Sequence, residues 1–217
     1  MSNRAIRQHL ELLLNSGIRE LYEPSSQART SLEQLANQYA NCQNCALHEG
    51  RVKFVYGEGD PHAGIMVIGE GPGEQENLSG RPFVGRAGDL LNKMLAAINL
   101  RREQVYIANI VKCRPPGNRN PLPEERIACL PYLIEQIQII QPQIFLMMGL
   151  VAAQTLLSTN EAMGVLRERE HVFMDRPAFV TYHPAALLRN EHWKRPAWED
   201  LQRFQKAWQE LASGSRP

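Results

Sequence analysis

Four short apolar segments lie in the middle of the chain and have the pattern of buried β-strands. They occupy residues 65–68, 105–111, 144–148 and 179–182. Amphipathic segments with a helical period separate the first three of them, at residues 87–98 and 123–140. Strands that alternate with helices are typical of βαβ units, in which the strands run parallel and helices cover both faces of the sheet. The pattern therefore predicts an α/β fold: a three-layer α/β/α sandwich around a central, mainly parallel four-stranded sheet.

Both ends of the chain carry further helical patterns. Residues 3–16 have a helical period, and the polar residues 23–30 indicate a linker. A capping box at residues 30–33 predicts a helix that continues to about Tyr39. A last amphipathic helix at about 197–212 has an apolar stripe that we interpret as core packing, made of Trp198, Leu201, Phe204, Trp208 and Leu211. We expect an N-terminal helical extension and linker at 1–30, followed by a single domain at 31–217.

Composition and charge narrow the class of protein. The 217 residues are 43% hydrophobic and 22% charged, which excludes a wholly disordered or fibrous chain. A net charge of +1 excludes a strongly cationic protein that coats nucleic acid, so any nucleic-acid site must be a local basic patch. No segment approaches the roughly 18 apolar residues of a membrane span, and the N-terminus lacks the features of a signal peptide. We expect a cytoplasmic, monomeric protein with no membrane association.

The four cysteines form a candidate metal site. Cys42 and Cys45 make a CxxC pair, whereas fifteen residues separate Cys113 from Cys129. In a reducing cytoplasm such cysteines are ligands more often than disulfides. A zinc ribbon uses two tight CxxC pairs, and the second pair here is not tight. An iron–sulfur cluster accepts one thiolate per iron from separated segments, so the spacing favours a cluster while leaving zinc and four unrelated buried thiols open.

An acidic, glycine-rich segment follows the first predicted strand, with the sequence GEGPGEQE at residues 69–76. It is neither a P-loop nor a GxGxxG fingerprint, because the required lysine and the third glycine are missing. Its three glutamates would repel phosphate. They suit a carboxylate placed near bound water or a developing positive charge, with an acidic surface turn as the alternative.

Three other residues have side chains that suit nucleobase recognition. Phe83 lies between glycines and near Arg81 and Arg86, a setting for stacking on a base or for packing on the sheet. Asn109 interrupts an apolar strand, and its amide either reads a pyrimidine edge or bonds the loop backbone. His183 ends the last strand at a turn into a helix, where a histidine is either structural or catalytic. Because ligands of open α/β sheets bind beyond the carboxyl ends of the strands, we expect these residues to share one site.

Five motifs in a fixed order make the pattern specific. They are CxxC-x-L-x₃-R at 42–51, GEGPGEQE at 69–76, GRPFVGRAG at 80–88, NIVKCRPPGNRNP at 109–121 and HPAALLR at 183–189. Together they resemble the family 4 uracil-DNA glycosylases, the iron–sulfur branch of the uracil-DNA glycosylase superfamily. The resemblance covers about residues 32–212 and leaves residues 1–30 outside. It implies the fold of that superfamily and an enzyme that flips uracil out of DNA and hydrolyses its N-glycosidic bond, leaving an abasic site in base excision repair.

The resemblance also implies a cofactor and a DNA-binding surface. Cys42, Cys45, Cys113 and Cys129 would hold a 4Fe–4S cluster without a redox part in the cleavage. The cluster would instead fix the loop 114–128 beside the DNA backbone. The arginines expected to contact uracil-containing DNA, single or double stranded, are Arg114, Arg119, Arg126 and Arg189.

The remaining roles concern the uracil pocket. By resemblance, Glu70 would position or polarise the attacking water and stabilise positive charge on the deoxyribose, and Gly71 would offer its backbone N–H to the base. Phe83 would stack on uracil, and Asn109 would donate to O4 and accept from N3–H. His183 would donate to O2 as the uracil anion leaves. Glu76 would crowd uracil C5 and exclude the methyl group of thymine.

Two departures from the family pattern bear on these roles. Gly71 stands where alanine is common, and Asn77 replaces an acidic residue. The branch that traps its product covalently has a basic insertion after the phenylalanine, which is missing here, and nothing in the sequence marks Lys112 as an activated amine. We therefore expect a monofunctional hydrolase. Two alternatives are a non-catalytic iron–sulfur protein that binds DNA or transfers electrons, and a nucleotide-binding α/β protein. Release of free uracil would distinguish a glycosylase from both.

Overall fold

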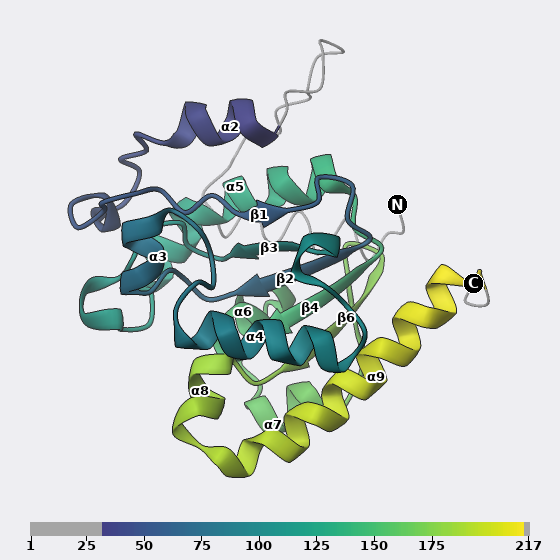
Figure 1. The fold of residues 1–217 in the computed structure, drawn as a ribbon. Helices are drawn as coiled ribbons and strands as arrows, with labels where there is room; N and C mark the ends of the chain where they lie inside the picture. Colours follow the sequence, from purple (N-terminus) through teal and green to yellow (C-terminus); the bar gives the residue numbers. More distant parts are fainter. Residues whose placement is uncertain (1–31, 215–217) are drawn as a thin grey trace.

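A mixed six-stranded sheet, in the order β1-β3-β2-β4-β6-β5, forms the centre of the protein (Figure 1). The computed structural model describes residues 32–214. The strands are β1 (Glu58–Gly59), β2 (Ile65–Gly69), β3 (Tyr106–Asn109), β4 (Ile144–Met148), β5 (His171–Phe173) and β6 (Arg176–Thr181). Strands β3, β2, β4 and β6 pair in parallel, and β1 and β5 pair antiparallel at the two edges. The expectation of four strands was therefore wrong, because edge strands of two and three residues are too short to leave a hydrophobic pattern.

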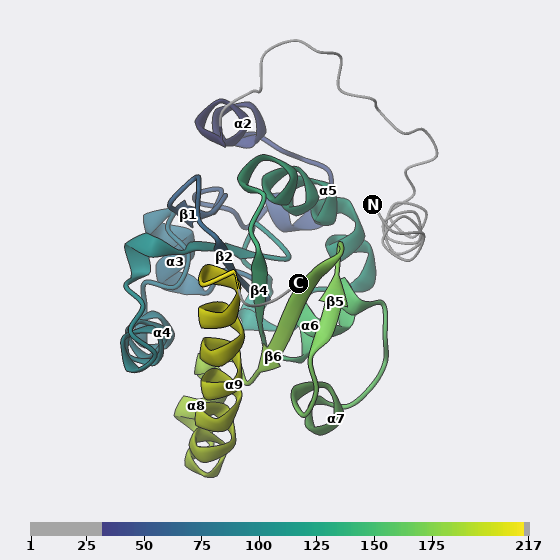
Figure 2. The ribbon, with the colours of Figure 1, turned by 90° about the vertical axis from the view of Figure 1, so that its right-hand side faces the viewer.

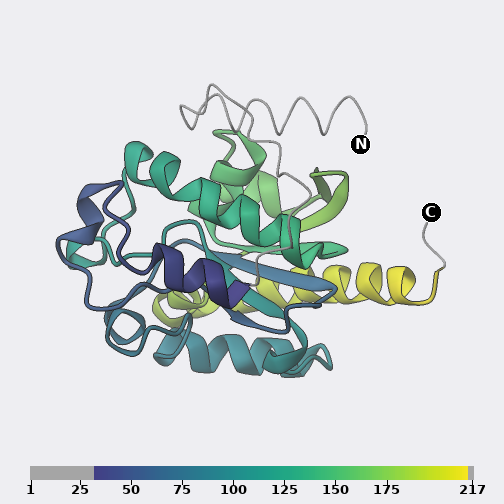
Figure 3. The same cartoon turned by 90° about the horizontal axis from the view of Figure 1, so that it is seen from above.

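Helices cover both faces of this sheet, as Figures 2 and 3 show. They are α2 (Leu32–Tyr39), α3 (Glu74–Ser79), α4 (Arg86–Ala97), α5 (Pro123–Ile140), α6 (Leu150–Leu157), α7 (Met163–Arg167), α8 (Pro184–Arg189) and α9 (Lys194–Ala212). Helices α4, α8 and α9 lie on one face, and α2, α5 and α6 lie on the other. The α/β class and the helices expected near 87–98, 123–140 and 197–212 are confirmed within three residues at each end.

The two faces of the sheet form two separate hydrophobic clusters. In β2, Met66 and Ile68 belong to the cluster beneath α5 and α6, while Ile65 and Val67 belong to the cluster beneath α4 and α9. All five residues of β2 are buried. A strand with both faces covered must be apolar at every position, which explains its continuous apolar run.

Helix α9 packs on the sheet through part of its expected apolar stripe. Leu201 and Phe204 are buried, and Trp208 and Leu211 pack partly buried against the same cluster. Trp198 is 40% exposed, so the core-packing interpretation is wrong for that residue. At the start of α9 the buried position is instead Ala197, which is 2% exposed and belongs to the same cluster.

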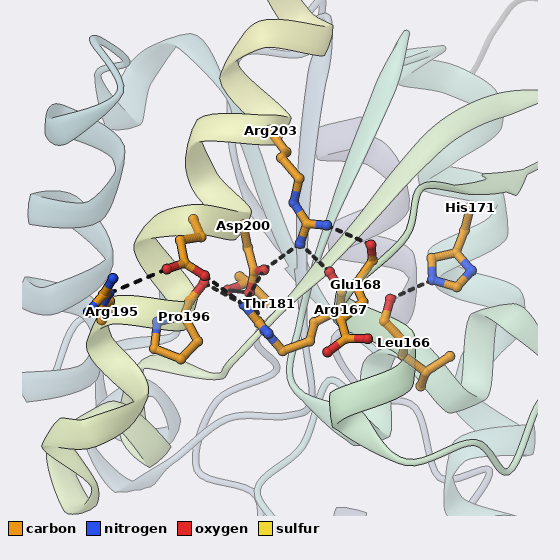
Figure 4. Close-up of polar contacts among 10 residues, drawn as sticks. Leu166, Arg167, Glu168, His171, Thr181, Arg195, Pro196, Asp200 and Arg203 are labelled. Atoms are coloured by element: carbon orange, nitrogen blue, oxygen red, sulfur yellow. Dashed lines mark hydrogen bonds and ion pairs between the residues drawn. The ribbon is translucent and has the colours of Figure 1, made fainter.

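A buried ion-pair network joins α9 to the end of β6 (Figure 4). Asp200 is 1% exposed, and its carboxylate accepts hydrogen bonds from Thr181, Arg167 and Arg203. A buried carboxylate is tolerated only when it is paired in this way. Since Thr181 is the last residue of β6, the network fixes the position at which the chain leaves the sheet towards His183.

Some expectations fall on residues outside the described range. These are the helix at 3–16, the linker at 23–30 and the first two residues of the capping box; the helix to Tyr39 is confirmed from Leu32 onwards. Among residues 32–214, no helix has both the length and the apolar character that a membrane span requires.

Candidate functional site

A cleft of about 590 Å³ opens where the parallel strands β2, β3 and β6 end. It is lined by all six residues expected to contact the base or the reacting bond: Glu70, Gly71, Glu76, Phe83, Asn109 and His183. In the sheet register, Gly69 pairs with Asn109, which places Glu70 and Asn109 side by side on neighbouring strand ends. The structure therefore brings these six residues together in one cleft.

Glu70 supplies the carboxylate of the cleft. It follows β2 directly, and its burial raises the pKa of the carboxyl above the usual value. The positive charges of Arg126 and Arg189 act in the opposite direction and favour the ionised form. A desolvated carboxylate with nearby cations is suited to hold a water molecule or to face a developing positive charge.

Asn109 is 2% exposed and lines the cleft. Its Oδ1 has no hydrogen-bond partner among the described residues. The amide lies over the β2 backbone, because a Cβ added to Gly69 would come within 2.5 Å of Oδ1. Burying an acceptor without a partner costs about 1–3 kcal/mol, so such an atom indicates a place for a ligand donor.

His183 is held as a neutral imidazole. It is the N-cap of α8, and its Nδ1 accepts a hydrogen bond from the backbone N–H of Ala185 at 3.2 Å. The proton of the neutral ring is then on Nε2, which can donate. Burial, with the charge of Arg189 second, lowers the pKa of His183 to about 4, so the ring is uncharged at neutral pH.

Phe83 lines the cleft at the end of β2, where its ring lies close to Gly69. It is 5% exposed, and its ring stacks on that of His183 with centroids 5.3 Å apart and planes 28° from parallel. Its φ of 51° is unusual for a bulky residue. The ring therefore packs within the protein and also lines the cleft.

Glu76 lines the cleft while its carboxylate faces the backbone. Oε2 accepts from the N–H of Gly73 at 3.1 Å. Oε1 accepts from Val84 at 2.8 Å and from Gly85 at 3.0 Å. Glu76 thus caps α3 and also holds the loop that carries Phe83.

The four cysteines line one small cavity on the α5 side of the sheet. Polar groups point at their sulfur atoms: the backbone N–H of Lys112 lies 3.2 Å from Cys129 Sγ, and an Arg51 N–H lies 3.6 Å from Cys113 Sγ. Burial raises the pKa of the Cys129 thiol to about 12. Within the described residues, no three His, Cys, Asp or Glu side chains are arranged around a point where a single metal ion would bind.

Comparison with known proteins assigns the family. The model of the uracil DNA glycosylase superfamily matches residues 56–212. The chain belongs to this superfamily. It is 43% identical over 184 residues to a type-4 uracil-DNA glycosylase of Pyrobaculum aerophilum, covering 80% of this chain and 92% of the relative. Type-4 uracil-DNA glycosylases of Archaeoglobus fulgidus (41% identical; 73% and 83% covered) and Thermotoga maritima (40%; 79% and 92%) are similar, so the chain is a member of the type-4 branch.

Of the four arginines expected at the DNA, the structure brings only Arg119 and Arg189 to the glycosylase cleft. The Arg119 guanidinium is committed to a bidentate pair with Glu125, with N–O distances of 2.6 and 2.8 Å. Arg114 contacts Asn118 and Glu74, and Arg126 donates to Thr155. The described residues hold no carboxylate within ion-pair distance of Arg189.

The alanine-to-glycine departure at position 71 has a local cause. A Cβ at Gly71 would lie 2.6 Å from Cγ2 of Val111. The β-branched side chain of Val111 cannot swing aside freely. In this glycosylase Val111 therefore fills the space that an alanine methyl group would need.

Lys112 lies outside the cleft. It is fully buried, and its Nζ donates to the backbone oxygen of Asn109 and to Gln136 Oε1. Burial lowers its pKa to about 7. Although that pKa suits an amine nucleophile, the ammonium group is among the side chains of α5 and not among the residues that line the cleft.

One wall of the cleft was not expected from the sequence. Trp193 and Tyr182 stack with centroids 4.9 Å apart and planes 12° from parallel, and Leu150 and Met163 complete an apolar rim. These residues come from four segments and have no common spacing. Only Trp193, an aromatic residue next to Lys194, offered a signal in the sequence.

Proposed function

We propose that the protein removes uracil from DNA by hydrolysing its N-glycosidic bond and leaves an abasic site for base excision repair. One observation carries this proposal: the Asn109 amide, whose buried Oδ1 has no partner among the described residues, lines the same cleft as the Glu70 carboxylate and the neutral His183 ring. A base must leave the helix to reach such a cleft, so the reaction requires base flipping.

Asn109 supplies the selection between bases. Its amide can donate to uracil O4 and accept from N3–H through Oδ1. Cytosine presents an acceptor at N3 and an amino group at C4, so both contacts would be lost. A site whose buried polar groups need a particular partner rejects a base that lacks that partner strongly.

Glu70 and His183 act on the reacting bond. As the bond between C1′ and N1 breaks, its electron pair leaves with uracil and positive charge develops on the sugar. Glu70 would stabilise this charge and orient the water whose oxygen bonds to C1′; the proton that this water loses would pass through Glu70 to solvent, from which the departed uracil anion takes up a proton. His183 would donate from Nε2 to O2 of the departing uracil anion, a role for which a neutral ring is suited. The Gly71 N–H would offer a further donor to the base.

Phe83 and Glu76 would shape the pocket around the base. Phe83 would stack on the uracil ring. Glu76 would face C5 and exclude a methyl group, although both of its oxygens also hold backbone N–H groups. We therefore expect Glu76 both to exclude a methyl group at C5 and to hold the loop that carries Phe83.

We further propose that the four cysteines hold a 4Fe–4S cluster. The shared cavity and the N–H groups aimed at the sulfur atoms support this assignment. A zinc ion needs four sulfurs about 2.3 Å from one point, whereas a cluster spreads its thiolates over four irons. The cluster would fix α5 and the loop before it, without a part in bond cleavage. Roughly four irons and four sulfides per chain are expected by analysis of anaerobically purified protein, and stoichiometric zinc would contradict the assignment.

DNA binding, oligomeric state and location belong to the same proposal. Arg189 is best placed for a phosphate contact at the cleft, with Arg114, Arg119 and Arg126 as the remaining candidates. We expect a monomer. A reducing cytoplasm, which keeps thiols available as cluster ligands, is the expected location.

Release of free uracil tests the proposed function. The purified holoprotein is incubated with oligonucleotides that contain one uracil, thymine or cytosine, without added metal or nucleotide, and released bases are measured by mass spectrometry. Free uracil and an alkali-sensitive abasic site are expected from the first oligonucleotide only. No release would favour a non-catalytic DNA-binding or electron-transfer protein, and a product trapped by borohydride would contradict simple hydrolysis.

A further inference from the structure

Arg102 contacts the loop that carries Phe83, although it belongs to none of the five motifs and does not line the cleft. It begins a short 3-10 turn, η2 (Arg102–Gln104), and its side chain is 13% exposed. Nη1 donates to the backbone oxygen of Phe83 at 3.0 Å, and Nη2 donates to that of Pro82. One guanidinium thus holds two successive carbonyl groups.

The peptide unit between Phe83 and Val84 is held from both sides by opposite charges. Its carbonyl oxygen accepts from Arg102, and its N–H donates to Glu76 Oε1 at 2.8 Å. The cation faces the negative end of the peptide dipole and the anion faces the positive end. Hydrogen bonds to ionised groups are about twice as strong as neutral ones, so this arrangement restrains the orientation of the peptide plane.

The loop needs such a restraint because Phe83 has a left-handed backbone conformation, with φ at 51°. A non-glycine residue in this region is strained, and it keeps this conformation only where its surroundings enforce it. Gly88 also packs closely here, since an added Cβ would come within 1.9 Å of the Phe83 oxygen. Release of the carbonyl groups would allow Phe83 to relax and its ring to leave the stack on His183.

Arg102 is itself fixed by neighbours on two elements. Its Nη1 lies 3.4 Å from Asn92 Oδ1 on α4, and its Nε lies 3.6 Å from Glu58 Oε1 on β1. Glu58 also forms a bidentate pair with the exposed Arg81. The edge strand β1 therefore contributes to the position of the guanidinium.

We propose that Arg102 is a positioning residue that orients Phe83 for stacking on the flipped base. This inference rests on the proposed function, because the importance of Phe83 follows from uracil excision. Arg102 acts through the Phe83–Val84 peptide and touches no substrate. Its removal should therefore matter only while the Phe83 ring is present.

A double-mutant cycle tests this dependence. Arg102→Ala, Phe83→Ala and the double variant are compared in single-turnover excision of uracil by the holoprotein, with Arg101→Ala as the matched control for loss of a neighbouring, exposed arginine. Arg102→Ala should slow excision about tenfold in the wild-type background and less than about twofold in the Phe83→Ala background. Arg101→Ala should remain within about twofold of the wild type. Equal losses from Arg102→Ala in both backgrounds, or no loss in either, would overturn the proposal.

Hydrogen exchange separates this inference from the proposed function. The amides of Val84 and Gly85 should exchange faster in Arg102→Ala and at the wild-type rate in Arg101→Ala. If the wild type releases no uracil but these amides exchange faster in Arg102→Ala, the proposed function fails while the restraint on the loop stands. If uracil is released and Arg102→Ala alters neither rate nor exchange, the role of Arg102 is refuted. Should Arg102→Ala fail to fold, Arg102→Lys, which cannot span both carbonyl groups, carries the same measurements.

Discussion

Replacing Gly149 with alanine should damage both stability and catalysis through His183. Gly149 follows β4 with φ at +92°, a conformation that L residues rarely adopt. A Cβ at this position would lie 2.9 Å from the Cβ of His183 and 3.7 Å from two of its ring carbons. His183 is itself the N-cap of α8, and its Cβ is bonded directly to the backbone. Side-chain rotation therefore cannot move this atom away, and the start of α8 must move.

The magnitude follows from two costs. The backbone conformation costs about 1–3 kcal/mol for a non-glycine residue, and the overpacking adds about 1–3 kcal/mol. A loss near 3 kcal/mol lowers the unfolding midpoint by roughly 6–12 °C in a domain of this size. A displacement of His183 by a few tenths of an ångström should slow excision by about three- to tenfold, since misplacement by 1 Å can cost about a hundredfold.

Two glycines with open surroundings provide matched controls. Gly117 has a positive φ of 62° but nothing within 4 Å of an added Cβ, so Gly117→Ala isolates the backbone cost. Gly164 in α7 has neither feature, so Gly164→Ala should be neutral or slightly stabilising. Thermal unfolding and single-turnover excision are measured on all three variants. If Gly149→Ala lost stability but cleaved uracil at the wild-type rate, the proposed link between its Cβ and His183 would be refuted.

Three other predictions follow from the cleft. Glu76→Ala should weaken discrimination against 5-substituted uracils. It should also slow uracil excision roughly tenfold, because two N–H groups of the loop lose their acceptor. Equal proportional losses of rate on every base would show that Glu76 does not select against C5 substituents. Folding lowers the pKa of His183 from 6.5 to about 4. Between these two pH values the unfolded chain binds a proton that the folded protein does not bind. The free energy of unfolding should therefore fall as the pH falls from 6.5 to 4. Denaturant unfolding of His183→Gln should show a shallower fall, and an identical pH dependence would contradict the assignment. Arg189→Ala should reduce the slope of log binding constant against log salt concentration for duplex DNA by roughly 0.9. Arg119→Ala should mainly lower the free energy of unfolding, because it leaves the buried Glu125 without the arginine it pairs with. A change in the salt slope for Arg119→Ala but not for Arg189→Ala would place the phosphate contact at Arg119.

The location of the site could be inferred from the sequence because two physical rules coincide. Parallel strands buried on both faces leave continuous apolar runs, and their carboxyl ends meet at one edge of the sheet. Glu70, Asn109 and His183 each follow or end such a run, so their convergence was predictable without coordinates. The edge strands β1 and β5 left no such signal, because they are short and partly exposed.

Side-chain partners were less accessible to sequence reasoning. Arg119 and Arg114 were expected to face DNA, yet each pairs with a nearby side chain, an outcome that depends on the path of the loop and not on residue type. The carboxylate of Glu76 turned towards backbone N–H groups for the same reason. Gly149 and Arg102 lie outside the motifs, and only the packed structure shows that each fixes a residue of the cleft.

The central claim is that Glu70 acts on the bond that breaks, and the single-turnover rate of Glu70→Gln tests it most directly. The variant keeps the shape of the side chain but cannot bear the negative charge. Its rate on uracil-containing DNA should fall by at least about a hundredfold, within the usual range for an acid–base or charged catalytic group, while its affinity for abasic-site DNA stays within about threefold. A rate within about threefold of the wild type would contradict the account.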